Sequence, residues 1–258
     1  MIKNIKVQKT LVRSLKLLLF IGVLYFFTIQ IFSIEWKQLT SVQLYNPVYL
    51  LFLSLLLPIN WGLELLKWQR VLKVNQIKFT LKELFYSLFS GVTTGIVTPN
   101  RIGNFIGRML FFKGKIRGQL ILGTLYSNFA QFLISLIFGI VGLFFLEEII
   151  FESVVDYIFP ILFTVVLISI LFYFTVPIVR LPRLKVLNQK LNILTKFQKN
   201  SKSLVFPFLF FSGLRYLVFS FQFLLMLMTF GVEPNFKIYA GILLIYLIST
   251  LTPSLIFG

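Results

Sequence analysis

Long apolar runs divide this chain and restrict its fold more than any other feature. Each is close to or above the roughly 17–25 residues that a helix needs to cross a bilayer. The runs cover residues 17–32, 47–68, 119–146, 154–179, 204–230 and 236–258. Hydrophobic residues make up 58% of the chain, against about 45–50% in soluble domains. A soluble fold is excluded, and the sequence predicts an all-α polytopic membrane protein: one transmembrane domain over residues 1–258, with about six spans.

The first run follows a basic segment without acidic residues. Lysine or arginine stands at positions 3, 6, 9, 13 and 16, as at the start of a signal peptide. No small-x-small cleavage site follows, and the run is longer than the roughly 7–15 residues of a signal-peptide core. We therefore expect an uncleaved first spanning helix behind a cytoplasmic basic amino terminus, residues 1–16.

The charges between the runs separate by sign. The chain has 25 Lys and Arg against 8 Asp and Glu, for a net charge of +17. Basic residues concentrate in residues 67–82, 108–117 and 180–203, whereas residues 147–156 hold acidic residues and no basic one. Because positively charged short loops stay in the cytoplasm, we predict a multi-pass cell-membrane protein with a cytoplasmic amino terminus and a basic amphipathic cytoplasmic loop over 180–203. Basic residues that interleave with spans also argue against a nucleic-acid partner.

Cysteine and histidine are both absent. This composition excludes disulfides, thiolate nucleophiles, zinc sites with the usual ligands and imidazole acid–base chemistry. The sequence has no nucleotide-binding motif, so movement of a substrate would be passive or driven by an ion gradient. We expect no catalytic residue, no metal and no cofactor, and an enzyme is the less favoured class.

The segment between the second and third runs, residues 79–112, has cytoplasmic flanks but is too apolar for an ordinary loop. Its centre, residues 90–104, reads SGVTTGIVTPNRIGN. Gly, Thr and Pro break helices and expose backbone groups, which the membrane interior tolerates only against protein or water. We therefore predict a re-entrant pair of half-helices, residues 80–90 and 102–112, separated by a Thr-Pro break.

A related pattern returns over residues 236–258. In both halves a full span, 47–68 or 204–230, leads through a short polar connection to an apolar helix, then Thr-Pro, then a Gly four or five residues later. The two spans would run in opposite directions, so the halves would form inverted repeats with broken helices, as in many transporters. The alternative is a chance match, because Thr-Pro is a common dipeptide.

Several motifs also resemble those of a known family. They are Asn60-Trp61, Glu64, Lys67-Trp68, Gly91, the string Thr98-Pro99-Asn100-Arg101-Ile102-Gly103-Asn104, and Thr252-Pro253. Over about the whole chain they resemble the membrane region of lysylphosphatidylglycerol synthases and related flippase-like integral membrane proteins. The resemblance implies a polytopic protein of the bacterial inner membrane. Several such proteins are proposed to move lipids between leaflets, and some are fused to a soluble aminoacyl transferase.

The sequence departs from the family pattern in three places. It has no soluble transferase domain. Asn104 stands where many relatives carry an acidic residue, which weakens a proton-relay role at this position. The family typically continues past the position of Gly258 through a Gly-x-x-Gly-x-Arg-Glu stretch and another helix. The chain is therefore expected to be truncated, with an incomplete second re-entrant element.

Polar residues within the second span are the first candidates for a binding site. Asn60, Glu64, Lys67 and Trp68 lie at i, i+4, i+7 and i+8, which places them on one helical face. A carboxylate that faces lipid is costly, so Glu64 should face the bundle and pair with Lys67 or Arg101. It would serve either a headgroup or proton site, or a structural ion pair.

Three arginines are candidates for binding phosphate, because a guanidinium offers a planar fork that matches a phosphoryl group. Arg101 and Arg108 are seven apart and would share a face if the segment after Pro99 is helical. For Arg108 we favour extension to the cytoplasmic interface, and for Arg101 substrate contact. Arg215 lies roughly 16 Å into its span, so it must face the interior, with Gln222 on the same side.

The sequence therefore predicts a lipid flippase or translocase that handles an anionic or phosphate-bearing headgroup. Its predicted substrate-binding residues are Asn60, Glu64, Lys67, Thr98, Pro99, Asn100, Arg101, Gly103, Arg108, Arg215, Thr252 and Pro253. Its expected partners are membrane lipids, with a homo-oligomer or a cell-envelope enzyme left open. The alternatives are a membrane-embedded transferase in lipid or polyprenyl-phosphate metabolism, with Glu64 or Glu83 as catalytic carboxylate, and a non-catalytic scaffold of an envelope enzyme.

Overall fold

The computed structural model divides the chain into two compact units, Met1–Gln43 and Leu44–Ile256, and all helices named below belong to the second. It describes residues 43–96, 98, 101–112, 116–146, 152–175 and 202–252, together with Tyr25, Thr28, Ile29 and Phe32. The predicted basic amino terminus, most of the first run, nearly all of the 180–203 loop and residues 253–258 lie outside the described residues.

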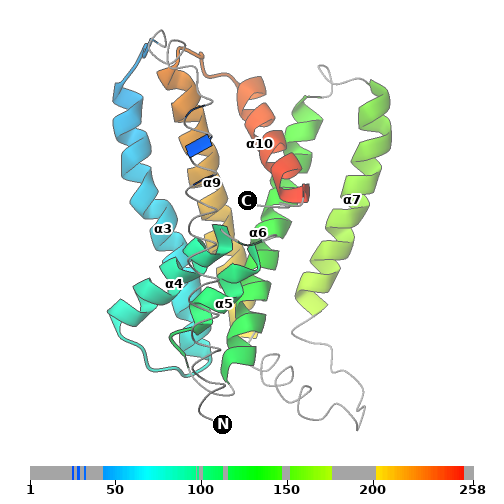
Figure 1. Cartoon of the computed structure of the whole chain (residues 1–258). Coiled ribbons are helices and arrows are strands. Elements are labelled where there is room, and N and C mark those ends of the chain that lie inside the picture. The colour runs from blue at the N-terminus through cyan, green and yellow to red at the C-terminus, as the bar shows by residue number, and fades with distance from the viewer. Residues whose placement is uncertain are drawn as a thin grey trace. The chain divides into compact units, whose positions relative to one another are not determined.

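Every regular element in the described part of the second unit is a helix (Figure 1). They are α3 (Val48–Val74), α4 (Leu81–Ile96), α5 (Gly103–Met109), α6 (Arg117–Phe145), α7 (Glu152–Thr175), the 3-10 turn η4 (Lys202–Leu204), α9 (Val205–Thr229) and α10 (Phe236–Leu251). Four of them, α3, α6, α7 and α9, are long and apolar enough to cross a membrane. The predicted all-α polytopic membrane class is confirmed.

The four long helices match four of the predicted spans, and α3 extends six residues past the predicted end at Trp68. Apolar length marks the part of a helix that lipid covers, whereas the helix itself continues into the basic residues that follow. The sixth run is a 16-residue helix, α10. At about 24 Å, its described length is shorter than the bilayer core of about 30 Å, and its place as the start of a second re-entrant element stays a prediction.

Helices α3 and α9 pack side by side in opposite directions (Figure 1). At one end the Tyr45 N–H donates to the Thr229 carbonyl at 3.0 Å, and toward the other the Arg70 guanidinium lies 5.2 Å from the centre of the Phe211 ring. Each helix is followed by shorter ones, α3 by α4 and α5, and α9 by α10. This antiparallel order is what inverted repeats require, and the repeat itself stays a prediction.

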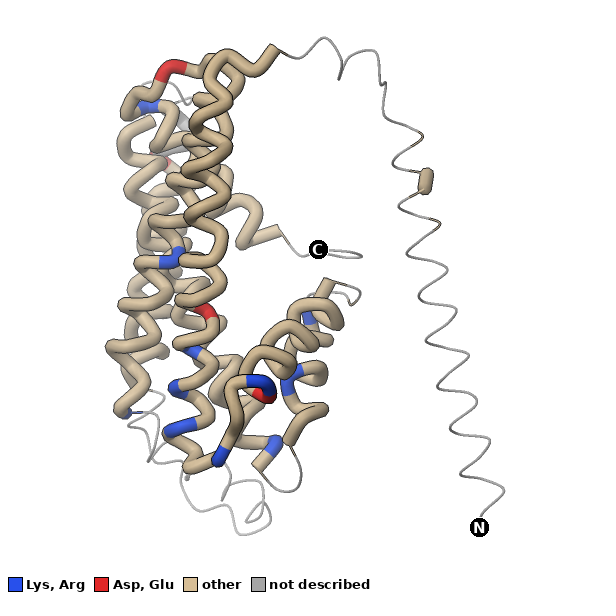
Figure 2. The backbone as a smooth tube through the Cα atoms, turned by 90° about the vertical axis from the view of Figure 1, so that its left-hand side faces the viewer, with Lys and Arg blue, Asp and Glu red and all other residues tan. Residues whose placement is uncertain are grey.

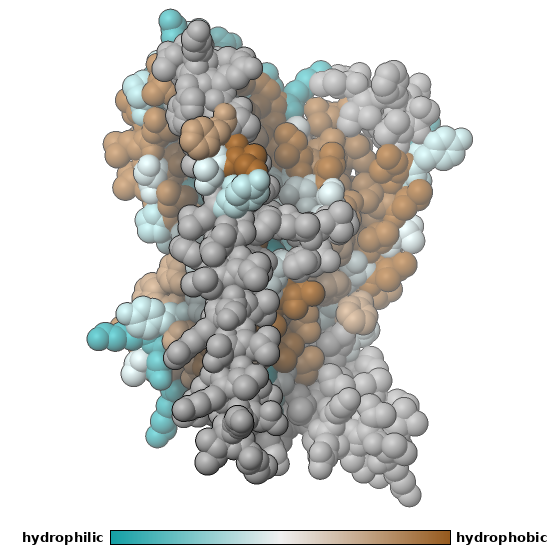
Figure 3. Space-filling view, viewed as in Figure 1, coloured by the Kyte–Doolittle hydropathy of each residue, from teal (hydrophilic) through white to brown (hydrophobic). Residues whose placement is uncertain are grey.

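Helix α6 contacts α7, α9 and α10. A large apolar cluster surrounds Trp68, Leu88 and Phe208, and a smaller one joins α6, α7 and α10 around Leu136 and Leu247. Apolar side chains, brown in Figure 3, also lie on the outside of the bundle in the described part of the face shown. Leu51, Leu171 and Phe210 are more than 60% exposed. Such large apolar surfaces are rare in water and are typical of contact with lipid.

The hairpin of α4 and α5 differs from the two predicted half-helices. Helix α4 continues to Ile96 rather than ending near residue 90, and α5 begins at Gly103 and ends at Met109. The glycines within this stretch serve close packing rather than helix breaking: a Cβ on Gly103 would overlap the Thr94 carbonyl, and one on Gly107 would overlap the carbonyl of Ser90. The chain therefore reverses later than predicted. Whether the hairpin re-enters the membrane stays a prediction.

Candidate functional site

A stripe of polar residues on α3 faces the interior of the bundle. Asn60, Glu64, Lys67 and Trp68 follow one another at helical spacing, and all four are buried. Glu64 is 4% exposed and Lys67 1% exposed. A charge buried to this degree is stable only with a partner, so the helices that pack on this stripe must supply one.

Three cationic side chains surround the Glu64 carboxylate. Arg108 Nη2 of α5 lies 2.8 Å from Glu64 Oε1, and Arg215 Nη1 of α9 lies 2.8 Å from Glu64 Oε2. Lys67 Nζ, one turn along α3, lies 3.5 Å from the same Oε2. Thus one carboxylate joins three helices. We call Glu64, Lys67, Arg108 and Arg215 the charge cluster.

The Arg108 side chain is held from three sides. Its Nε donates to Asn104 Oδ1 at 2.9 Å, and its guanidinium lies 5.1 Å from the centre of the Trp68 ring. Trp68 is itself fixed, because its Nε1–H donates to Ser87 Oγ on α4 at 2.8 Å. Arg108 is 2% exposed, so it is a buried part of the cluster.

The Arg215 side chain is held by a chain of amides. Its Nε donates to Asn60 Oδ1 at 2.8 Å, and Asn60 Nδ2 donates to Gln222 Oε1 at 3.2 Å. Gln222 Nε2 then donates to the Leu53 carbonyl on α3 at 3.2 Å. In contrast to its partners, the Arg215 side chain is 30% exposed. It is the member of the cluster that a ligand can reach.

The cluster carries excess positive charge, and its members on α3 and α9 lie at different depths in the apolar stretches. At about 1.5 Å per residue, Glu64 is about 6 Å from the end of the apolar part of α3 at Trp68, and Arg215 is about 15 Å from the start of α9. Most other Lys and Arg residues gather toward the end of the bundle where α3 ends (Figure 2). Three cations face one carboxylate, which leaves two positive charges without a counter-charge in the described part of the site.

A family model described as the lysylphosphatidylglycerol synthase TM region matches residues 13–258. The chain belongs to this family. No curated protein and no solved structure matched it. The predicted resemblance is confirmed, and the four apolar helices of this lysylphosphatidylglycerol synthase TM region make the chain an integral membrane protein.

Several sequence predictions about this family member agree with the geometry. The predicted face of α3 is buried as one stripe, and Glu64 pairs with Lys67. Arg215 faces the interior and meets a carboxylate, and it is linked to Gln222 through Asn60. These agreements concern position and contacts, and substrate binding by these residues stays a prediction.

Two expectations about arginine positions are wrong. Arg108 does not extend to an interface but is buried against Glu64. Arg101 is exposed, has a left-handed backbone (φ 55°) and makes no ion pair with any described residue. Arg108 is buried because Glu64 and Trp68 of α3 hold its guanidinium. Arg101 lies in the turn before α5 starts, so it shares no helical face with Arg108, and its predicted substrate contact stays a prediction.

Three of the remaining predicted site residues, Thr98, Gly103 and Thr252, are described, and each lies at or next to the end of a helix. Thr98 Oγ1 accepts from the Gly103 N–H and donates to the Thr94 carbonyl, at 2.7 and 2.9 Å, so both residues hold the α4–α5 turn. Thr252 follows α10, and its hydroxyl donates to the Ile248 carbonyl at 2.8 Å. None of these contacts reaches the charge cluster. Pro99, Asn100 and Pro253 lie outside the described residues.

Sequence reasoning missed some supporting residues. Ser87 orients Trp68, and Asn104 positions Arg108. Nothing in the local sequence marks Ser87. Gly91 and Gly95 of α4, like Gly103 and Gly107 of α5, are four residues apart, a spacing typical of close helix pairs in membranes. That spacing could have predicted the α4–α5 packing, and with it the contact of Asn104 with α4.

Proposed function

We propose that this member of the lysylphosphatidylglycerol synthase TM region family binds the anionic or phosphate-bearing headgroup of a membrane lipid at the charge cluster and moves the lipid between leaflets. The observation that carries the proposal is the net surplus of two positive charges at the cluster, whose Glu64, Lys67 and Arg215 lie on the long apolar helices α3 and α9. Uncompensated charge in such helices is costly, and an anionic ligand would supply the missing counter-charge.

The donors that remain suit a phosphoryl group. Arg215 uses Nε and Nη1 on Asn60 and Glu64, and within the described residues its Nη2 has no hydrogen-bond partner. Lys67 offers three N–H donors and has one carboxylate oxygen at 3.5 Å. A guanidinium held in a fixed orientation binds a phosphate through parallel hydrogen bonds. We therefore assign Arg215 the direct contact with phosphate, with Lys67 and Arg108 adding positive potential.

The arrangement of the helices supports translocation. Antiparallel α3 and α9 each lead into shorter helices, and transporters with inverted repeats of broken helices bind substrate where the repeats meet. The proposal places the protein in the cell membrane with the amino terminus in the cytoplasm. A reporter fused after Glu148 should then be external and one after Gln198 cytoplasmic; the reverse at either point would contradict the inverted repeat.

A transferase needs a carboxylate that is free to act as acid or base, and the two candidates are engaged. Glu64 binds three cations. Glu83 accepts from the Thr80 N–H at 2.8 Å and from the Thr80 hydroxyl at 3.0 Å, at the start of α4. A scaffold would not need buried excess charge. Translocation is therefore the function that the site supports best.

The test uses the full chain in liposomes that contain fluorescent phosphatidylglycerol and a quencher added outside. The parent protein should expose inner-leaflet lipid to the quencher faster than empty liposomes do. Arg215→Gln should lose most of this rate, by about tenfold or more for one charge-assisted contact. The matched control Arg70→Gln removes an exposed arginine outside the cluster and should keep the rate. A new lipid product instead of exchange would favour the transferase.

A further inference from the structure

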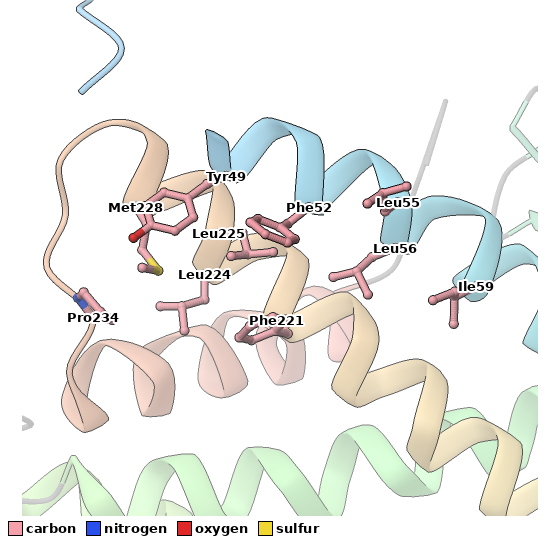
Figure 4. Close-up of a pocket in the computed structure, with 10 residues that line it drawn as sticks. All are labelled: Tyr49, Phe52, Leu55, Leu56, Ile59, Phe221, Leu224, Leu225, Met228 and Pro234. Atoms are coloured by element: carbon pink, nitrogen blue, oxygen red, sulfur yellow. The ribbon is translucent and has the colours of Figure 1, made fainter. Parts of the chain in front are cut away.

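An apolar groove runs between α3 and α9. It has a volume of about 510 Å³. Ten residues line it: Tyr49, Phe52, Leu55, Leu56, Ile59, Phe221, Leu224, Leu225, Met228 and Pro234. In Figure 4 side chains from the two helices line its opposite sides. Only Tyr49 among these residues carries a hydroxyl, amide or charged group, so the groove suits an occupant without hydrogen-bonding groups.

The groove and the charge cluster lie on the same two helical stripes. On α3, Phe52 and Leu56 line the groove, and Asn60 and Glu64 continue at the same spacing of four residues. Residues four apart lie on one face of a helix. The apolar stripe of α3 therefore leads directly into the cluster.

On α9, too, residues that line the groove lie on the same helical face as a residue of the charge cluster. Leu225 lines the groove, Gln222 lies three residues before it, and Arg215 lies seven before Gln222, all on one face. The Asn60–Gln222 hydrogen bond joins the two stripes where the apolar lining ends. An occupant that leaves the groove past this amide pair meets the exposed side of Arg215.

The groove also has the length of one leaflet. From Tyr49 to Ile59 it follows α3 for about 15 Å, which is half of a hydrocarbon core of about 30 Å. Phe52, Leu55 and Ile59 are at least half exposed, whereas Leu225 is buried. The groove thus has a closed floor and an open side, through which a chain could enter from the bilayer.

We infer that this groove holds an acyl chain of the anionic lipid whose phosphate binds Arg215. The inference rests on the proposed function, since it names the second half of the same ligand. A lipid bound in this way has its headgroup at the charge cluster and its chain extended toward the end of the bundle where α3 begins. The site then recognises an amphiphile, so a headgroup without a chain binds weakly.

The test places the photoreactive residue p-benzoylphenylalanine at Phe221 in the groove or, as a matched control, at Phe210. Both are exposed phenylalanines of α9, and Phe210 does not line the groove. The full chain is reconstituted in vesicles with equal amounts of phosphatidylglycerol and phosphatidylcholine, irradiated and analysed by mass spectrometry. Adducts at Phe221 should be enriched in phosphatidylglycerol by about tenfold, and adducts at Phe210 should match the bulk composition. Arg215→Gln should abolish the enrichment at Phe221.

Adducts of bulk composition at Phe221, or cross-links there to the chain itself or to a second copy, would overturn the inference. Translocation in the same vesicles separates this failure from that of the proposed function. If exchange depends on Arg215 but no enrichment occurs, the groove assignment is wrong and the function stands. If enrichment occurs without exchange, the groove assignment stands and translocation is wrong. Leu56→Trp, which fills the groove, should reduce the enrichment, whereas Leu51→Trp on the lipid-facing side should not.

Discussion

Arg215 Nη1 lies 2.8 Å from Glu64 Oε2, in an ion pair that joins α9 to α3 within their membrane-spanning stretches. The same carboxylate also binds Arg108 and Lys67. Loss of one cation therefore leaves Glu64 paired, whereas loss of Glu64 leaves three cations without a counter-charge. This asymmetry predicts which substitutions affect folding and which affect function.

Glu64→Gln should strongly destabilise the protein. Two of its three partners are almost completely buried, and an unpaired buried charge costs about 3–5 kcal/mol. Thermal denaturation in detergent should show a clear loss relative to the parent. Glu233→Gln, at an exposed position between α9 and α10, is the matched control and should leave the melting temperature unchanged. A Glu64→Gln protein as stable as the parent would contradict the role of Glu64 as counter-charge to the three cations.

Arg215→Gln should cost about 1 kcal/mol or less, because Glu64 keeps two partners and the lost pair is partly exposed. The double variant with Glu64→Gln should be less stable than Arg215→Gln alone. If the Glu64 carboxylate depended mainly on Arg215 for its stability, the single variant would lose several times more. Denaturation of all four proteins in one double-mutant cycle decides between these outcomes.

Some positions in the charge cluster could be predicted from the sequence, and others could not. The α3 stripe follows from helical spacing, and the inward position of Arg215 follows from the cost of charge in lipid. Arg108 could not be assigned, because its direction depends on where α5 begins, and helix boundaries are set by packing. Thr98, Gly91 and Gly95 predicted an early end of the helix, because these residue types disfavour helices. Their close contacts with α5 cannot be seen in the sequence.

Gly107→Ala should destabilise the α4–α5 hairpin. The added Cβ would overlap the Ser90 carbonyl, and overpacking costs roughly 1–3 kcal/mol. Gly62→Ala on α3 is the matched control, because no neighbouring atom lies within 4 Å of its added Cβ. It should be neutral or stabilising, since Ala favours a helix over Gly. Equal melting temperatures for the two variants would contradict the close packing.

Glu83 should make the first turn of α4 sensitive to acid. The Thr80 N–H and then the Thr80 hydroxyl, which both donate to the carboxylate, hold the pKa of Glu83 below its usual value. Because folding favours the charged form, its stabilisation is present above the unfolded pKa and is lost as the pH falls through the lowered folded pKa. The protection factors of the first amides of α4, which correct for the pH dependence of intrinsic exchange, should fall over that range in the parent. If a Glu83→Gln variant showed the same dependence of α4 amide exchange on pH, another group would be responsible.

The most direct test of the account measures whether the surplus charge of the cluster binds lipid phosphate. Purified full-length protein in detergent is heated with added phosphatidylglycerol or phosphatidylcholine, because a ligand that binds only the folded state raises the melting temperature. Phosphatidylglycerol should raise the melting temperature of the parent more than phosphatidylcholine does. Arg215→Gln should melt near the parent without lipid and lose the phosphatidylglycerol-specific increase, while Arg70→Gln keeps it. An Arg215→Gln protein that retains the full increase would contradict the claim that this arginine binds the headgroup.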